Sequence, residues 1–322
     1  HTPVPINDRC ASREDDKRHQ GFCCIKLNQH KRTLADFIVL GTAQFGMDYG
    51  ITNVSGRPSK PEAFRILEYA WERGIRRFDT APGYDSEELL GDFIRTNGIE
   101  RDVIVLTKIS GLEGNESHRA RISQSMDFSR RRINSQIDTL FFHDPANSRL
   151  LLEDEIFFRE LLETRQVNNI GVSVYDPVEV ERLGTCELGL AFQFPLNVLD
   201  RRFENVEMTL GKRYARSIFL QGLLASSNAL RAGAPPDILS LHKRYHDKLK
   251  SHGVSPVDFA TSFVKNSNCV DYFLVGVNTV MQLKKLLAIR FEGVWPNSLT
   301  APLISRLPEK LIDPRTWGEG ER

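Results

Sequence analysis

The sequence predicts an α/β protein whose single domain is a closed (β/α)8 barrel of the TIM type. From Phe37 onward, short apolar runs of strand type alternate with longer amphipathic runs of helix type, which is typical of a parallel sheet with right-handed crossovers. Eight strand candidates within roughly 250 to 280 residues match the size of one such barrel. The turn after the first strand has neither the G-x-G-x-x-G nor the Walker lysine spacing expected of an open doubly wound sheet.

Residues 1 to 33 precede the first strand candidate and carry charged runs without a periodic apolar pattern. We therefore expect an irregular or flexible N-terminal extension here. Residues 34–322 are assigned to the barrel and a C-terminal tail.

Each strand candidate is a short run of aliphatic, β-branched or aromatic residues that ends at a polar or turn-forming residue. The candidates are Phe37–Leu40, Ile75–Phe78, Val103–Thr107, Thr139–Phe142, Ile170–Ser173, Leu190–Phe194, Ser217–Leu220 and Tyr272–Val275.

The helix candidates between the strands show apolar residues at helical spacing. In the first, Phe64, Leu67 and Trp71 fall on one face and Gly74 supplies a C-terminal stop. The longest insertion, Ala225 to Asp237, follows the seventh strand, a natural place for a substrate-side loop. The helix candidates are Pro61–Arg73, Glu87–Thr96, Ser117–Arg132, Glu153–Thr164, Pro177–Leu183, Asn205–Tyr214, Pro235–Ser251 and Pro256–Asn266.

Composition excludes several classes of function. Basic and acidic residues number 43 and 42, so bulk charge gives no reason to expect a nucleic acid or an anionic membrane as partner. The apolar runs are too short to span a membrane, and the N-terminus lacks the apolar region of a signal peptide. Five cysteines without framework spacing predict reduced thiols in a cytoplasmic protein. No cysteine and histidine spacing indicates a metal site.

Polar side chains follow three consecutive strand candidates. Asp79 ends the second strand and Tyr84 lies in the loop after it, Lys108 follows the third strand, and His143 follows the fourth. Taken singly, the aspartate suits a turn, the lysine a snorkelling side chain and the histidine a core position. Because parallel strands end at the same edge, about 4.8 Å apart, these four groups are expected to converge.

The four groups have a common chemistry. A buried Lys108 beside Asp79 stays charged because the carboxylate offsets desolvation. Its ammonium is expected to lower the pKa of Tyr84 from the reference value near 10 and to let the phenol exchange a proton near neutral pH. A neutral His143 can orient a carbonyl oxygen. This arrangement suits carbonyl reduction or alcohol oxidation, and since no side chain donates hydride, it implies a cofactor.

These motifs resemble the aldo-keto reductase superfamily, in order and register, from about Phe37 to about Leu287. The segments that carry the resemblance are Asp79-Thr-Ala-Pro-Gly-Tyr84-x-Ser86-Glu87, Thr107-Lys108 and Phe142-His143.

The resemblance implies a catalytic tetrad. Tyr84 would be the general acid, Lys108 and Asp79 would tune it, and His143 would orient the carbonyl oxygen. The resemblance also implies a small-molecule carbonyl substrate and a nicotinamide cofactor, NADP(H) in preference to NAD(H), held across the barrel mouth without a separate nucleotide-binding domain.

The resemblance also assigns cofactor contacts, with departures from the family pattern. Val174 stands where the family has asparagine, Arg216 where an aromatic residue stacks on nicotinamide, and Gln282 where an arginine often grips the adenosine phosphate. A guanidinium plane can stack on a ring as well. The expected cofactor-binding residues are Thr42, Ser173, Gln193, Arg216, Phe219, Gln221, Gly222, Asn278 and Gln282.

Two alternatives remain open at this point. Lys108 could act as the nucleophile of a Schiff-base lyase or aldolase, although an ion-paired lysine is a poor nucleophile. The chain could also be a non-catalytic or regulatory cofactor-binding protein, since a fold alone does not fix function. Several segments are similar in sequence to those of a bacterial branch of the superfamily. Some members of that branch are associated with surface-sugar pathways, so a sugar-like carbonyl is the expected substrate. The sequence does not indicate an oligomeric state.

Overall fold

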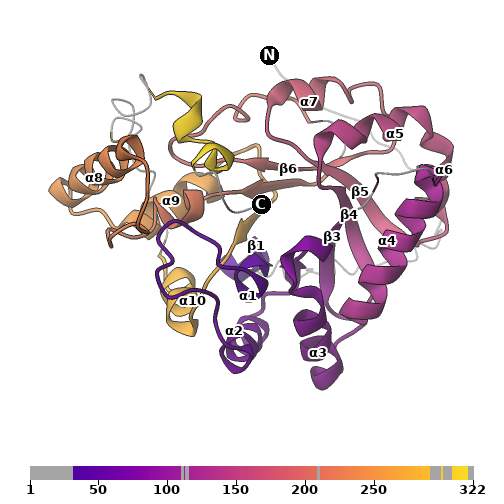
Figure 1. The fold of residues 1–322 in the computed structure, drawn as a ribbon, viewed down its shortest axis with the longest axis horizontal. Helices are drawn as coiled ribbons and strands as arrows, with labels where there is room; N and C mark the ends of the chain where they lie inside the picture. Colours follow the sequence, from indigo (N-terminus) through magenta and orange to yellow (C-terminus); the bar gives the residue numbers. More distant parts are fainter. Residues whose placement is uncertain are drawn as a thin grey trace, which may run out of the picture. The chain divides into compact units, whose positions relative to one another are not determined.

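The computed structural model describes residues 32–109, 112, 116–208, 211–290, 299 and 307–317. Within this part of the chain, eight parallel strands close into a barrel in sequence order (Figure 1). The predicted (β/α)8 barrel is therefore confirmed. The predicted irregular extension at residues 1–33 lies outside the described residues except for Arg32 and Thr33.

The strands are short and every neighbouring pair is parallel. They are β1 (Ile38–Gly41), β2 (Arg77–Asp79), β3 (Ile104–Ile109), β4 (Ile137–Phe142), β5 (Val167–Ser173), β6 (Ala191–Pro195), β7 (Arg213–Arg216) and β8 (Tyr272–Val275).

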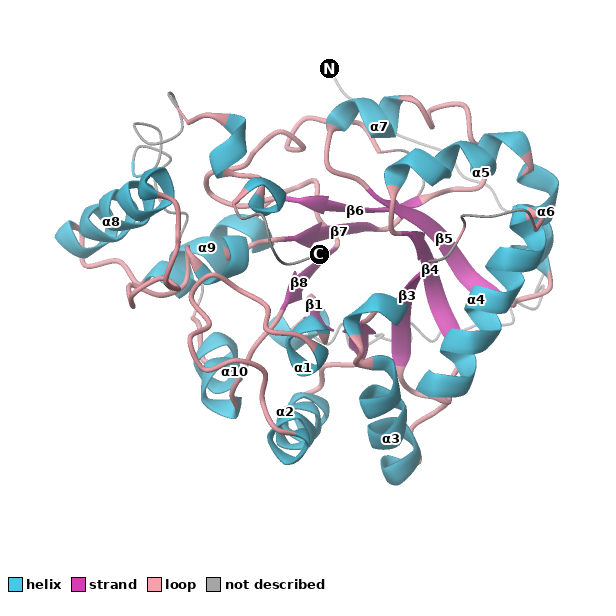
Figure 2. Cartoon of the chain, in the orientation of Figure 1, coloured by secondary structure: helices cyan, strands magenta, loops and turns pink. Residues whose placement is uncertain are grey.

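Helices surround the strands (Figure 2), and side-chain oxygens of Ser59, Ser117, Asp176, Ser255 and Thr279 accept backbone N–H groups at five of the helix N-termini. None of the described helices is long and apolar enough to cross a membrane. The helices are α1 (Ala43–Gly46), α2 (Lys60–Glu72), α3 (Glu87–Asn97), α4 (His118–Ile133), α5 (Leu150–Glu153), α6 (Glu155–Glu163), α7 (Pro177–Glu181), α8 (Pro236–Ser251), α9 (Pro256–Lys265) and α10 (Val280–Leu287).

The seventh strand was predicted wrongly at Ser217–Leu220. The chain pairs instead at Arg213–Arg216, where Tyr214 points into the barrel interior. Ser217 and Leu220 have φ angles of 57° and 46°, which no strand residue adopts. The strand was missed because its alternating polar residues look less strand-like than the apolar run that follows it.

The predicted helix at Asn205–Tyr214 is also wrong. Among its described residues there is no helical segment, and the last two belong to β7. Gly211 lies so close to β6 that a Cβ atom on it would meet the carbonyl oxygen of Leu190 at 1.7 Å. The described residues between β6 and β7 therefore lack the helix that strict alternation predicts.

Strand alternation decides which side chains enter the barrel. The interior holds a small apolar cluster of Val39, Leu106, Phe141, Ala191 and Tyr214. The residues between them point outward into the larger core under the helices. Because successive side chains point to opposite faces, the inward positions two residues after Leu106 and Ala191 are those of Lys108 and Gln193. The layer above the apolar cluster is therefore polar.

Candidate active site

A buried ion pair forms the centre of this polar layer. Asp79 is the last residue of β2 and Lys108 the fifth of β3; their exposed fractions are 3% and 1%. The Lys108 Nζ atom lies 2.8 Å from Asp79 Oδ1 and also donates to the carbonyl oxygen of Thr80 at 2.9 Å. The predicted pairing of these two residues is present in the structure.

Gln193 reaches the same carboxylate from the opposite side of the barrel. Its Nε2 atom donates to Asp79 Oδ2 at 2.9 Å, and β6 lies four strands from β2 in the closed order. A carboxylate only accepts hydrogen bonds, so the amide nitrogen must face Asp79 and the amide oxygen must face away from it. Each oxygen of Asp79 therefore has its own donor.

Tyr84 lies above the ion pair. It ends a short 3-10 turn, Pro82–Tyr84, and its ring centroid is 4.6 Å from the Lys108 Nζ atom. Gly46, at the end of α1, allows this turn to pack closely, because a Cβ atom there would meet the Tyr84 carbonyl oxygen at 1.8 Å. The turn is thus positioned by backbone contact with the first loop of the barrel.

His143 follows β4 directly and is partly buried. Its ring meets the Tyr84 ring edge-on, with centroids 5.9 Å apart and planes at 90°. Burial, together with the positive charge of Lys108, lowers the pKa of His143 to about 4. The imidazole is therefore neutral at pH 7 and can donate a hydrogen bond without carrying charge.

The pKa of Lys108 is raised above its usual value. Burial by itself lowers this pKa, but the Asp79 carboxylate and the Tyr84 hydroxyl together outweigh that effect. The lysine is therefore charged at neutral pH, as predicted.

The expected lowering of the Tyr84 pKa is wrong for the protein without a bound cofactor. Burial raises this pKa, and the opposing effect of the Lys108 ammonium does not cancel it, partly because Asp79 raises the pKa as well. The phenol is consequently protonated at neutral pH. The Tyr84 hydroxyl is therefore in the form that can donate a proton.

A second set of hydrogen bonds, which sequence reasoning missed, supports the ion pair from beneath. Thr42, predicted to bind the cofactor, donates from Oγ1 to the Asp79 carbonyl oxygen at 3.0 Å and contacts Ser86 Oγ at 2.7 Å. Thr107 donates to Glu87 at 2.8 Å. These polar side chains are all buried, and they tie β1, β3 and the start of α3 to the end of β2.

Arg216 ends β7 and lies close to the end of β5. Its Nη2 atom donates to the Val174 carbonyl oxygen at 2.9 Å, and its guanidinium carbon is 3.9 Å from the centroid of the Tyr175 ring. The arginine therefore stacks on an aromatic ring of the protein itself. Ser173, the last residue of β5, pairs in register with Gln193 on β6, so two predicted carboxamide ligands are neighbours.

The segment after β7 has an unusual backbone. Gln221 and Gly222 have φ angles of 53° and 92°, and a Cβ atom on Gly222 would meet Thr52 Oγ1 at 2.0 Å. The Gln221 carbonyl oxygen accepts the Ile51 N–H at 3.1 Å, while Phe219 packs against the main core. Strained backbone of this kind clusters at functional sites, and here it brings the segment against the loop after β1.

The last two predicted cofactor residues are engaged with each other. The Gln282 side-chain oxygen accepts the Asn278 N–H at 2.7 Å, and Asn278 Nδ2 donates to the Gly56 carbonyl oxygen at 3.2 Å. Gln282, in the first turn of α10, therefore ties this helix to Asn278, the residue before its N-cap Thr279. Its side chain is exposed.

Three residues near the site were not predicted. The first is Tyr49, which lies near Tyr84. Burial and the neighbouring Tyr84 phenol raise the pKa of Tyr49 to about 12. Tyr175 follows the end of β5, and its sequence neighbours Ser173 and Val174 were the signal that could have found it. Arg315 comes from the C-terminal segment, 3.6 Å from the Tyr175 ring centroid, and nothing local in the sequence points to it.

The comparisons with known proteins agree with this geometry. A model of the Aldo/keto reductase family matches residues 37–292. The chain is 28% identical to pyridoxal 4-dehydrogenase of Microbacterium luteolum, over 83% of this chain and 92% of that protein. It is 28% identical to D-threo-aldose 1-dehydrogenase of Pseudomonas sp, over 82% and 96%. The structure of a glycerol dehydrogenase from Gluconobacter oxydans superposes with a TM-score of 0.63 at 21% identity, covering 86% of this chain and 93% of that one.

Proposed function

Because this chain belongs to the aldo/keto reductase family and is thus an oxidoreductase acting on carbonyl compounds or alcohols, we propose that it is an NAD(P)H-dependent carbonyl reductase with Tyr84 as general acid. One observation carries the proposal. The charged Lys108, fixed by Asp79, lies 4.6 Å from the ring centroid of a protonated phenol whose other neighbour is a neutral imidazole.

In this proposal the chain's own residues bind, orient and protonate the carbonyl compound. His143 donates a hydrogen bond to the carbonyl oxygen and fixes its position. Tyr84 gives its proton to the same oxygen as negative charge develops there. Lys108 stabilises the phenolate that remains through its positive charge. The Asp79 carboxylate, 2.8 Å away, helps to keep Lys108 charged in this buried site. In alcohol oxidation the same groups act in reverse.

The residues opposite Tyr84 fit a nicotinamide cofactor, which when bound supplies or accepts the hydride. Gln193 has its amide oxygen turned away from Asp79 and lies beside Ser173, so an acceptor and a hydroxyl are available for a carboxamide group. The strained Gln221–Gly222 backbone and the N-terminus of α10 would hold the remainder. Following the family resemblance, we propose NADP(H) in preference to NAD(H).

Two observations bear on the alternatives. The raised pKa of Lys108, caused by Asp79 against the effect of burial, disfavours a Schiff-base lyase, because a protonated amine is not a nucleophile. A non-catalytic role would be favoured by the departures at Val174 and Arg216. Borohydride trapping with an aldehyde, followed by mass spectrometry, tests the first alternative, and an adduct on Lys108 would support it.

The substrate we propose is a small, sugar-like aldehyde or ketone. The names of two relatives, an aldose dehydrogenase and a pyridoxal dehydrogenase, support a polar carbonyl or alcohol of modest size. A screen of aldoses and aldehydes with NADPH and NADH, read by loss of absorbance at the nicotinamide band, would identify it.

Tyr84→Phe is the decisive variant. We expect it to lower turnover of 4-nitrobenzaldehyde by about 100- to 10,000-fold, the usual contribution of a general acid, while quenching of NADPH fluorescence is unchanged. Tyr49→Phe is the matched control, since it removes a neighbouring buried phenol, and it should retain turnover. Full activity in Tyr84→Phe would remove Tyr84 from the proposed role.

A further inference from the structure

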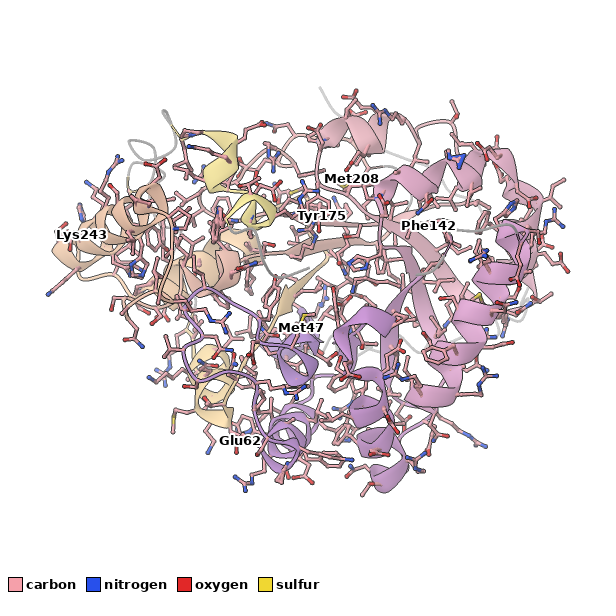
Figure 3. The ribbon with its side chains drawn as sticks, in the orientation of Figure 1. Met47, Glu62, Phe142, Tyr175, Met208 and Lys243 are labelled. Carbon is pink, nitrogen blue, oxygen red and sulfur yellow. The ribbon has the colours of Figure 1, made fainter. Side chains whose placement is uncertain are left out.

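Three side chains from distant parts of the chain stack at the carboxyl end of the barrel. The guanidinium carbons of Arg216 and Arg315 lie 3.9 Å and 3.6 Å from the centroid of the Tyr175 ring. Two guanidinium groups cannot both occupy one face of a ring at such distances without overlapping, so the ring lies between them. Figure 3 labels Tyr175 beside the C-terminal segment drawn in yellow.

The outer arginine is anchored. Ile312 and Trp317, on either side of Arg315 in the sequence, are buried against α8. Asp313 accepts hydrogen bonds from the Nε and Nη2 atoms of Arg315, with Nε to Oδ1 at 2.9 Å. The charge of Arg315 is therefore matched within its own segment, and its plane holds Tyr175 in place from the solvent side.

Arg216, on the other side of the Tyr175 ring, forms no such ion pair with any of the described residues. The carboxylate whose pKa its charge helps to lower, that of Asp313, is already hydrogen-bonded to Arg315. The Nη2 atom of Arg216 donates to the Val174 carbonyl oxygen at 2.9 Å, its Nη1 atom donates to Ser217 Oγ at 3.5 Å, and its Nε atom is buried without a hydrogen-bond partner. A buried N–H group without a partner is costly, and a guanidinium without a counter-ion is the group that most readily binds an anionic oxygen.

Arg216 also faces the reacting groups. It ends β7 at the same edge of the barrel as His143 and Tyr84, and its charge contributes to lowering the pKa of His143, after burial and Lys108. One face of its guanidinium is already covered by Tyr175. The Nη hydrogens that donate to neither Val174 nor Ser217 are therefore the part of Arg216 that remains for a ligand.

We propose that Arg216, backed by Tyr175, binds an anionic group of the substrate, so that the preferred substrates are aldehydes or ketones that carry a carboxylate or a phosphate. This inference rests on the proposed carbonyl reductase function and adds the substrate class. It replaces stacking on nicotinamide as the role of Arg216. The two sources of anionic oxygen are separated by matched substrates.

The test compares neutral and anionic aldehydes of similar size. Butanal is paired with succinic semialdehyde, and glyceraldehyde with glyceraldehyde 3-phosphate. In the wild-type protein we expect kcat/KM to be at least about 10-fold higher for one of the anionic members, and in Arg216→Gln we expect this advantage to fall by about 10- to 100-fold, the effect of losing a charged hydrogen bond. In the same variant kcat/KM for the neutral members should fall by less than it does for the anionic members.

Two further variants separate the roles of charge and ring. Tyr175→Phe keeps the ring and should keep the preference for the anion, whereas Tyr175→Leu removes the stacking partner of Arg216 and should lose part of it. Arg95→Gln is the matched control for charge, because Arg95 is an exposed arginine at the end of α3 whose side chain is 58% accessible. It should leave both substrate classes unaffected.

Three results would overturn the proposal. One is a wild-type protein without preference for an anion. Another is an equal loss on neutral and anionic substrates in Arg216→Gln together with weaker NADPH binding, which would make Arg216 a cofactor ligand. If the wild type reduces no aldehyde at all, the proposed reductase function is wrong. Calorimetric titration with succinate and with inorganic phosphate then tests the anion site directly. Equal binding by the wild type and Arg216→Gln would refute the anion site.

Discussion

Asp79→Asn should destabilise the folded protein strongly at neutral pH and much less at high pH. The exposed fraction of Lys108 is 1% and its Nζ atom lies 2.8 Å from the carboxylate. Removing one partner of a buried ion pair and leaving the other charged costs about 3–5 kcal/mol. Asparagine conserves shape, and its amide oxygen can still accept from Gln193, so the change acts mainly on charge.

The pH dependence follows from the pKa of Lys108. In the wild type this pKa is raised above its usual value near 10.5, because Asp79 and Tyr84 together outweigh the effect of burial. The pair therefore stabilises the fold fully below the unfolded pKa, and this stability is lost as pH rises through the folded pKa. In Asp79→Asn burial is opposed by Tyr84 without the carboxylate, so we expect the folded pKa of Lys108 to fall below the unfolded value. The penalty is then full at neutral pH and shrinks as pH rises toward 10.5.

The assay is urea unfolding followed by tryptophan fluorescence, from pH 7 to pH 10, for the wild type, Asp79→Asn and the double variant Asp79→Asn, Lys108→Met. The double variant carries no buried ammonium, so it should recover part of the lost stability and show little pH dependence relative to the wild type below pH 9. A loss that is constant from pH 7 to pH 10 and equal in both variants would refute the reasoning. It would then arise from packing or from the Gln193 hydrogen bond.

Two other predictions concern single groups of the same layer. Gln193→Met should lower the free energy of unfolding by about 1.5–3 kcal/mol, since Asp79 Oδ2 loses the donor at 2.9 Å. Gln193→Glu should lower the free energy of unfolding further above pH 5. A Gln193→Met variant as stable as the wild type would show that water replaces the amide. For His143, whose pKa is lowered to about 4 by burial and by Lys108, the rate of aldehyde reduction should show no histidine titration between pH 5 and pH 8. An inflection near pH 6.5 that disappears in His143→Asn would contradict the neutral imidazole.

The barrel and the central ion pair could be predicted because both depend on local signals. An apolar run followed by a charged residue marks the end of a buried parallel strand, and the alternation of side chains places Asp79 and Lys108 on the same interior face. These signals do not depend on distant contacts. The same is true of His143, which follows β4 directly.

The elements that were missed depend on contacts between distant segments. The position of β7 is decided by Tyr214, which fills the barrel interior against Phe141, and by the close approach of Gly211 to Leu190. Hydrophobicity alone favoured the run that follows. Arg315 is the extreme case, since only the docking of the C-terminal segment brings it to Tyr175.

The prediction that the Tyr84 pKa is lowered was wrong for a different reason. A neighbouring positive charge is visible in the sequence, whereas the depth of burial is not. Burial disfavours the phenolate more than the Lys108 ammonium favours it. Sequence reasoning therefore placed Lys108 and Tyr84 side by side, as the structure has them, and misjudged which of two opposing effects on the Tyr84 pKa is larger.

This raised pKa changes how the layer must work. A phenol that resists ionisation is a weaker acid, so in the mechanism that we propose proton donation by Tyr84 would require the full charge of Lys108 at the moment the phenolate forms. Lys108 keeps that charge because Asp79 and Tyr84 together outweigh its burial, and the second oxygen of Asp79 is held by Gln193 from across the barrel. The four side chains therefore act as one electrostatic unit. Substitutions within it should be non-additive, because once any member is lost the others no longer hold the charge that the phenolate needs.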